Sequence, residues 1–168
     1  MPLEQYTIIP NVNTSSTQLF TATNNDISLL EKTFDITTDQ DYKDYVTNHG
    51  CGILGGTYIR VYLPQVTMLL QKEWQERINQ YWFWDEGKEV LTKDQALQSV
   101  VLGDTLDGDE IILFEQQYYV LPRHEEMIYK IGDTLGDAIA WLCSTGILTE
   151  AFVEREFEPF DPAEYRQQ

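Results

Sequence analysis

A change of hydrophobic periodicity near residue 100 restricts the fold of this chain more than any other feature. Before that point, apolar side chains recur at helical spacing, as at Tyr42, Tyr45 and Val46, which places them on one face of a helix. After it come short segments rich in β-forming residues, joined by connectors too short for crossover helices. This segregated order indicates an α+β domain rather than an alternating α/β fold.

The strand-like segments are expected to form a single mixed, mostly antiparallel sheet flanked by the helices. A first strand is predicted at Thr57–Leu63, because successive side chains of this segment would point to opposite faces of a sheet. Ile111–Phe114 is apolar on both faces, which predicts an interior position in the sheet. The four predicted strands after residue 100 are Val100–Leu102, Glu110–Phe114, Tyr118–Leu121 and Met127–Ile131.

Capping signals predict where the helices begin. Asn25 or Asp26 can accept hydrogen bonds from the free amides of a first short helix. Pro64 ends the strand before it and can serve as the first residue of a long helix. Two more helices are predicted to begin with capping boxes, in which each side chain satisfies the other residue's backbone amide. The two pairs are Thr38 with Asp41, and Thr134 with Asp137.

The expected domain organisation has three parts. Residues 1–25 form an N-terminal arm or loop, residues 26–148 form the α+β domain, and residues 149–168 form an acidic tail packed on it. Phe152, Phe157 and Phe160 are the rings that would hold this tail. Gly50 is expected to end the second helix with a positive φ. Residues 85–98 are polar and are expected to form a loop with about one turn of helix.

The charge of the chain separates classes of partner. The sequence has 28 acidic and 11 basic residues, a net charge of −17, and residues 104–168 hold 15 acids and 4 bases, or −11. Such a field repels phosphate backbones, so direct binding of nucleic acid is not expected. The same field attracts a basic protein and speeds its encounter, although solubility alone also accounts for an acidic composition.

Cysteine content and hydropathy predict the compartment. Cys51 and Cys143 are too few for a disulfide framework. The start of the chain has no charged segment followed by an apolar stretch, and the longest apolar run, residues 138–143, is far short of a bilayer span. We therefore expect a cytoplasmic protein with reduced thiols and no membrane contact.

Catalytic chemistry has weak support in the sequence. His49 and Cys51 could form a base and a nucleophile, but His49 also fits the apolar stripe of a helix, and packing is the favoured interpretation. The acids between Gly103 and Glu110 offer oxygen ligands for a hard cation, yet their spacing is not that of an EF-hand. We predict no catalytic residue, no metal and no cofactor. A carbohydrate-active or metal-dependent hydrolase is the further alternative.

Aromatic residues and acids supply the candidate binding residues. The aromatic cluster that ends the long helix exceeds what one helical stripe can bury, and exposed Trp side chains are typical binding anchors. Packing of these rings into the core is the alternative. We predict that a basic protein binds an acidic face with these residues: Asp104, Asp107, Asp109, Glu110, Trp82 and Trp84.

Several segments together resemble the SUKH superfamily. Asp41–Val46 followed by Asn48–Gly52 resembles the opening motif of that superfamily, and Asp107–Ile111 resembles the entry into its central strand. Tyr118–His124 and a closing helix through residues 138–142 complete the order. The resemblance spans roughly residues 26–146. The sequence departs from it at Thr37–Gln40, where the superfamily usually has a Leu-Pro turn.

The superfamily groups fungal cell-wall-assembly regulators with bacterial proteins, many of which are regarded as immunity proteins that neutralise secreted toxins, often nucleases. The resemblance implies an α+β fold with one mixed sheet flanked by helices. It carries over no catalytic or binding residue. The expected function is therefore that of a non-enzymatic protein-binding module, foremost an immunity protein against a toxin such as a nuclease. A cell-wall or signalling regulatory adaptor is the alternative.

Overall fold

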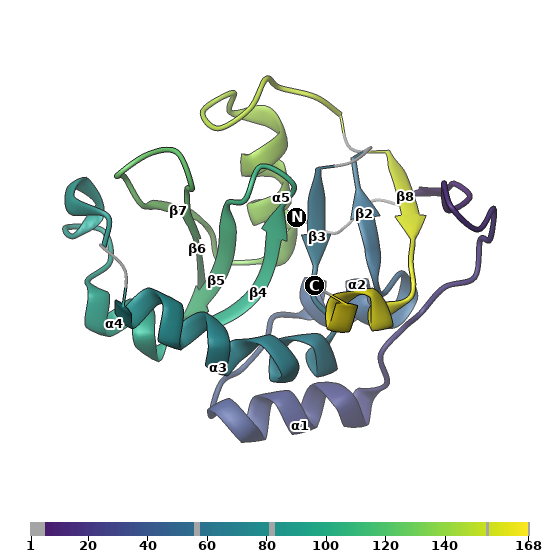
Figure 1. Ribbon diagram of the computed structural model, residues 1–168, viewed down its shortest axis with the longest axis horizontal. Helices are drawn as coiled ribbons and strands as arrows, with labels where there is room; N and C mark the ends of the chain where they lie inside the picture. Colours follow the sequence, from purple (N-terminus) through teal and green to yellow (C-terminus); the bar gives the residue numbers. More distant parts are fainter. Residues whose placement is uncertain (1–5, 56–57, 81–82, 154, 168) are drawn as a thin grey trace.

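The structure is a computed structural model that describes residues 6–55, 58–80, 83–153 and 155–167. It has the expected α+β architecture, with one sheet and helices on both sides (Figure 1). The helices are α1 (Asn24–Phe34), α2 (Gln40–Asn48), α3 (Pro64–Gln80), α4 (Lys93–Gln98) and α5 (Leu135–Ser144), with 3-10 helices η1 (Asp85–Gly87) and η2 (Pro162–Gln167). The strands are β1 (Thr7–Ile8), β2 (Gly52–Leu54), β3 (Ile59–Val61), β4 (Val100–Thr105), β5 (Glu110–Phe114), β6 (Gln117–Leu121), β7 (Tyr129–Gly132) and β8 (Glu156–Pro159).

The sheet is mixed and mostly antiparallel. Its strand order is β1-β8-β2-β3-β4-β5-β6-β7, and among the described strands only β1 and β8 pair in parallel. Strand β5 lies between β4 and β6, with Ile112 and Leu113 buried. The predicted interior position of this apolar strand is therefore confirmed, because both of its faces are covered.

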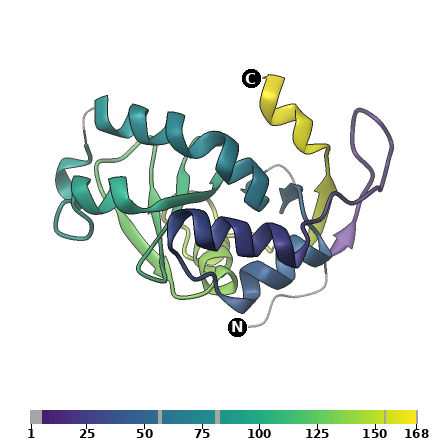
Figure 2. The same cartoon turned by 90° about the horizontal axis from the view of Figure 1, so that it is seen from below.

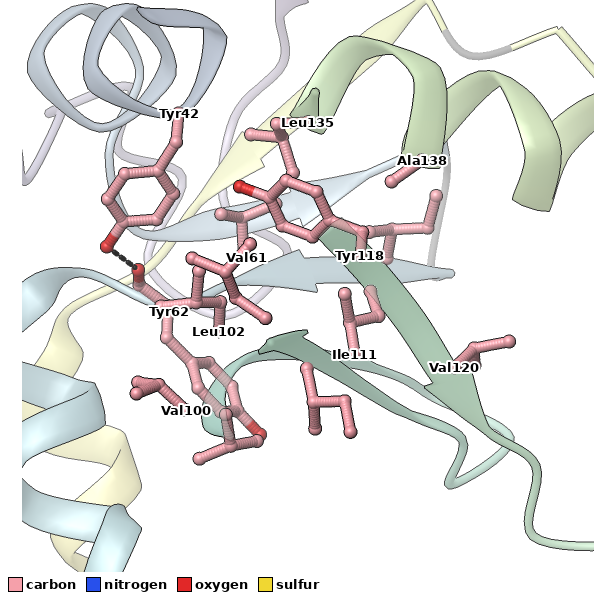
Figure 3. Close-up of a cluster of buried hydrophobic side chains, with 14 of the residues drawn as sticks. Tyr42, Val61, Tyr62, Val100, Leu102, Ile111, Tyr118, Val120, Leu135 and Ala138 are labelled. Atoms are coloured by element: carbon pink, nitrogen blue, oxygen red, sulfur yellow. Dashed lines mark hydrogen bonds between the residues drawn. The ribbon is translucent and has the colours of Figure 1, made fainter. Parts of the chain in front are cut away.

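The helices form two layers around the sheet. Figure 2 shows α3 and η2 on one side of the strands and α2 with α5 on the other, while α1 crosses one end. On the α2 and α5 side, Tyr118 of β6 packs beside Leu135 of α5 (Figure 3). Tyr42 of α2 reaches the sheet through its hydroxyl, which donates to the backbone oxygen of Tyr62 at 2.9 Å. This layer holds a well-packed core.

Two capping boxes lie where the sequence analysis did not place them. Helix α1 is capped by Thr23, whose side chain accepts from the Asp26 amide while Asp26 accepts from Thr23; the predicted caps, Asn25 or Asp26, lie inside the helix. Thr92 and Gln95 form the same arrangement at α4. Residues 85–98 therefore hold η1 and α4 joined by a loop, which is more helix than the single turn expected, because this box stabilises a short helix that polar composition alone does not reveal.

The cap of α2 is also one residue away from its predicted position. Asp39, not Thr38, accepts from the first turn of α2. Thr38 instead donates through its amide and hydroxyl to Glu31, at 2.7 and 3.0 Å. Because Thr38 is hydrogen-bonded to Glu31 of α1, the side chain of the next residue, Asp39, caps α2 instead. Thr134 does cap α5, where it accepts from the Asp137 amide at 3.1 Å.

Both ends of the chain contribute strands to the sheet. The segment expected as an N-terminal arm contains β1, and Asn11 donates to the backbone oxygen of Pro159 at 2.9 Å. The acidic tail contains β8, which the sequence analysis did not predict and which lies between β1 and β2. Its Phe157 is fully buried. A four-residue strand with two glutamates and a proline carries too weak a pattern to be recognised in the sequence.

Gly50 has the predicted positive φ, at 85°. A Cβ at this position would lie only 2.0 Å from the backbone oxygen of Phe20, the residue that forms a β-bridge with Gly50. We expect Gly50→Ala to lower the free energy of unfolding by about 2 kcal/mol, through unfavourable left-handed backbone and this overlap. Urea denaturation measures the change. An unaltered midpoint would contradict the close approach of residues 20 and 50.

Candidate functional site

Three strands bring charged side chains into one row across the sheet. The register pairs Arg60 on β3 with Asp104 on β4, and Asp104 with Glu110 on β5. Directly paired residues point to the same face of a sheet, so these side chains are neighbours. The row lies on the face bordered by α3 and η2, because Arg77 of α3 contacts Glu110 and Arg60 lies over the ring of Tyr165 in η2.

Arginines hold both carboxylates of this row. Arg60 Nε donates to Asp104 at 2.8 Å, and a second guanidinium nitrogen completes the fork. Arg77 donates to the two oxygens of Glu110 at 3.1 and 2.6 Å. The Tyr62 hydroxyl also donates to Asp104, and burial followed by the charge of Asp104 raises the pKa of that hydroxyl. Asp104 and Glu110 are therefore neutralised locally and offer little free charge to a basic partner.

A cleft of about 700 Å³, here called the sheet-face cleft, lies beside the row. Asp104, Glu110 and Trp84 line it, so the structure brings three of the predicted binding residues together. The Trp84 indole donates to the Pro122 backbone oxygen at 2.6 Å. Trp82, the other predicted anchor, lies outside the described residues. The rest of the lining consists of Arg77, Ile78, Gly108, Leu121 and Arg123.

Asp109 and Asp107 occupy different environments. Asp109 is 4% exposed, and its carboxylate accepts from the Thr105 hydroxyl at 2.9 Å and from the Arg123 amide at 3.0 Å. It therefore fastens the β4–β5 turn to the segment after β6 instead of facing solvent. Asp107 is exposed at the same turn. Of the four acids predicted to form one face, only Asp107 has an exposed side chain without a neutralising arginine.

Cys51 is packed in the core, and the partly buried His49 lies against aromatic rings at its edge. Cys51 is buried, and burial raises the pKa of its thiol, which disfavours the thiolate that a nucleophile requires. The His49 ring lies 5.2 Å from the ring of Tyr6, 5.6 Å from that of Tyr45 and 5.5 Å from that of Phe157, measured between ring centres. The sequence interpretation of His49 as a packed side chain is confirmed.

A second hollow lies at the end of the sheet, between the α1–α2 connection and the β5–β6 turn. Two adjoining cavities of about 360 and 470 Å³ share their lining at Thr37, Leu113, Glu115 and Gln116. We call the pair the acidic groove, because its lining in the described chain contains four carboxylates and neither Lys nor Arg. These carboxylates belong to Asp35, Asp39, Glu115 and Asp133.

Three residues of the acidic groove have left-handed backbone. Glu115 (φ 49°) and Gln116 (φ 64°) are the two residues that join β5 to β6, and Asp35 (φ 52°) ends α1. A two-residue hairpin loop with positive φ at both positions is a type I′ turn, which Asn-Gly normally supplies. Other residues in this conformation cost on the order of 1 kcal/mol or more each, and such strain collects at functional sites.

Two carboxylates of the acidic groove are exposed and have no ion-pair partner in the described part of the chain. Asp39 accepts hydrogen bonds from other parts of the fold, and Asp133 pairs with Lys130 at 3.3 Å in an exposed contact. Asp35 and Glu115 are exposed, and no ion pair to either is present in the described part of the chain. Their charges are the ones that a partner can reach most readily.

Sequence reasoning missed the acidic groove for identifiable reasons. Asp35 and Glu115 are distant in sequence, and their proximity depends on how α1 packs at the end of the sheet. The β5–β6 turn lacks the glycine and asparagine that mark a type I′ turn. The available signal was the short spacing between two predicted strands, which left a tight connection containing Glu115 and Gln116.

Comparisons with known proteins do not assign this chain to a family. Protein-family models and curated proteins both give no match to this chain. Across residues 6–55, 58–80, 83–153 and 155–167, no three His, Cys, Asp or Glu side chains gather into a group that could hold a metal ion. The helices of that same part are all too short or too polar to cross a membrane. The SUKH resemblance therefore stays a prediction.

Proposed function

We propose that this chain is a non-enzymatic protein-binding module that neutralises a toxin by covering a basic surface, such as the substrate-binding surface of a nuclease. The acidic groove carries this proposal, because four carboxylates line it and its described lining has no base. The net charge of −17 adds a long-range field of the same sign. Both features favour a positively charged partner over an anionic one.

Competition with phosphate gives the binding a means of inhibition. A nuclease holds its substrate with Lys and Arg side chains that displace counterions from the phosphates. A protein that presents carboxylates on a rigid surface can pair with those same side chains and exclude the substrate. No catalytic group is needed for this effect, since occupancy alone blocks the substrate.

The backbone of the groove favours a fixed presentation of its charges. Asp35 ends α1 and its amide donates to the backbone oxygen of Glu31, while Glu115 belongs to a turn closed by the β5–β6 ladder. Both free carboxylates are thus attached to backbone that secondary structure restrains. Charges held in place before binding lose less conformational entropy when a partner arrives. The groove is therefore suited to rigid docking.

Charge reversal within the groove is expected to slow association with the partner. We expect Asp35→Lys combined with Glu115→Lys to lower the association rate at low salt by about tenfold, because steering between opposite charges is lost. Raising the salt concentration should lower the association rate of the unaltered protein and reduce the difference between its rate and that of the double variant. Stopped-flow or surface-plasmon measurements with the partner isolated from the native cell provide the rates.

Glu86→Lys combined with Glu89→Lys is the matched control. These exposed acids lie away from the groove lining, and the two double variants carry the same net charge. Equal slowing by the two pairs would contradict a role for the groove and leave only the overall field. The activity of the captured partner then decides the biological role. Suppression of a toxic activity supports an immunity protein, whereas a partner without such activity supports a cell-wall or signalling adaptor.

A further inference from the structure

The sheet-face cleft is separate from the acidic groove, and the two linings share no residue. At about 700 Å³ it has the size of cavities that accommodate small organic ligands or a few residues of a peptide. Its lining combines charged groups with Ile78, Trp84 and Leu121. The hydrogen-bonding capacity of these groups determines which ligand chemistry fits.

The acceptors of the cleft are already used. One oxygen of Asp104 accepts from Arg60, and the other accepts from Arg60 and from the Tyr62 hydroxyl. The two oxygens of Glu110 each accept from Arg77. Each carboxylate is thus engaged by a forked pair, which is among the stronger side-chain contacts. A cationic ligand would have to displace an arginine before it could bind either one.

The donors of the cleft are only partly used. A guanidinium has five N–H groups, and Arg77 directs two nitrogens to Glu110. In the described part of the chain, the Arg123 guanidinium has neither a hydrogen-bond acceptor nor an ion-pair partner, although its backbone amide is fastened to Asp109. The Arg123 side chain lies across Gly108, where a Cβ would come within 2.5 Å of its Cδ. Gly108 therefore leaves room for this side chain to cross the turn.

The apolar part of the lining complements these donors. The indole N–H of Trp84 is occupied by the Pro122 oxygen, so its ring is left to make apolar or stacking contacts. The Phe83 ring packs against the Trp84 ring in a T-shaped arrangement with 5.3 Å between ring centres, which restricts the orientation of the indole. Ile78 from α3 and Leu121 from β6 border the cleft but are almost fully buried. A ligand therefore meets a cationic group and the Trp84 ring within one cavity.

We propose that the sheet-face cleft binds a carboxylate that carries an aromatic or large apolar group, with Arg123 pairing the carboxylate and Trp84 contacting the ring. A planar carboxylate matches the fork of a guanidinium. A phosphate, with more negative charge, would be repelled more strongly by the nearby Asp104 and Glu110 and by the acidic chain as a whole. This chemistry occurs in free aryl-alkyl carboxylic acids and at the carboxyl end of a peptide. The site does not depend on the acidic groove.

Two probes that differ only in the carboxylate test this site. Isothermal titration of the full chain with N-acetyl-L-phenylalanine and with N-acetyl-L-phenylalaninamide compares the charged and neutral forms. We expect the acid to bind at least about tenfold more tightly than the amide, as a charge-assisted pair at a partly enclosed site predicts. Arg123→Gln should abolish this preference, while Arg123→Lys should retain part of it.

Lys72→Gln is the control, since it removes an exposed positive charge from α3 without touching the cleft lining. Lys72→Gln should leave the preference for the acid over the amide unchanged. Trp84→Leu should weaken the binding of an aromatic acid more than the binding of an aliphatic acid. A peptide ending in phenylalanine identifies the source of the ligand. Tighter binding than the N-acetyl amino acid supports a carboxyl-terminal peptide, and equal or weaker binding supports a free acid.

Three results would overturn the site. They are equal binding of acid and amide, an unchanged preference in the Arg123→Gln protein, and no binding of the acid up to about 10 mM, where even a weak fragment-sized ligand registers. These outcomes are distinguishable from failure of the proposed function. The titration uses no protein partner and leaves Asp35 and Glu115 unaltered.

Discussion

Asp39→Ala is expected to lower the free energy of unfolding by about 4 kcal/mol, because one carboxylate joins two helices and the sheet. One oxygen of Asp39 accepts from the Tyr42 amide at 3.2 Å and from the Leu135 amide at 2.8 Å, so it serves the first turns of both α2 and α5. The other accepts from the Tyr118 hydroxyl at 2.6 Å. Removal leaves the fully buried Tyr118 without its acceptor.

A second substitution separates these contributions. Tyr118→Phe in the Asp39→Ala background removes the stranded hydroxyl and should restore roughly 1–2 kcal/mol, since an unsatisfied buried group costs about that much. Asp44→Ala is the control, because Asp44 is exposed on the same helix and should change stability by about 0.5 kcal/mol or less. Urea denaturation followed by circular dichroism gives all three values. No recovery in the double variant would contradict the role of Asp39 as acceptor for Tyr118.

Phe157→Ala is expected to lower the free energy of unfolding by about 4 kcal/mol, because it leaves a cavity in the core. Phe157 is fully buried in β8, and its ring packs edge-on against Tyr45 at 6.0 Å between centres. The same ring covers Gly52 of β2, where a Cβ would come within 2.4 Å of it. The side chain therefore joins the carboxyl-terminal strand to α2 and to its neighbour in the sheet.

The control for Phe157→Ala is a substitution of an exposed residue in the same carboxyl-terminal segment. Val153→Ala alters a residue that is 68% exposed, and it should change stability by about 0.5 kcal/mol or less. Hydrogen exchange adds a local measurement, because loss of β8 packing should accelerate exchange at the amides of β2. If Phe157→Ala lowers the free energy of unfolding by less than about 1 kcal/mol and leaves amide exchange in β2 unchanged, β8 is not an integral part of the core.

Patterns that repeat along the sequence predicted the main elements of this fold. Tyr42, Tyr45 and Val46 are fully buried, as their helical spacing indicated. Strand β5 has the predicted bounds and an interior position. Features that depend on one competing contact were harder to predict. The cap of α2 moved to Asp39 because Thr38 is engaged by Glu31, which comes from another helix.

The candidate site was less predictable because charge in a sequence does not reveal its neutralisation. Asp104 and Glu110 were interpreted as a free acidic face, yet each is paired with an arginine from a distant segment. Asp109 proved to be an internal anchor for Arg123. Conversely, Asp35 and Glu115 lay in unremarkable connections, and they share a cavity only because tertiary packing brings two turns together.

The insertion of β8 between β1 and β2 determines when this protein can finish folding. Thr7 of β1 pairs with Glu156 of β8, so the first described strand must wait for the last described strand to be made. A ribosome releases β1 before β8 has been made, so β1 cannot form its ladder with β8 until that later strand is translated. A product truncated before Glu156 would leave β2 with an open edge that can recruit other chains. Late synthesis of β8 therefore leaves this edge of the sheet uncovered for much of translation.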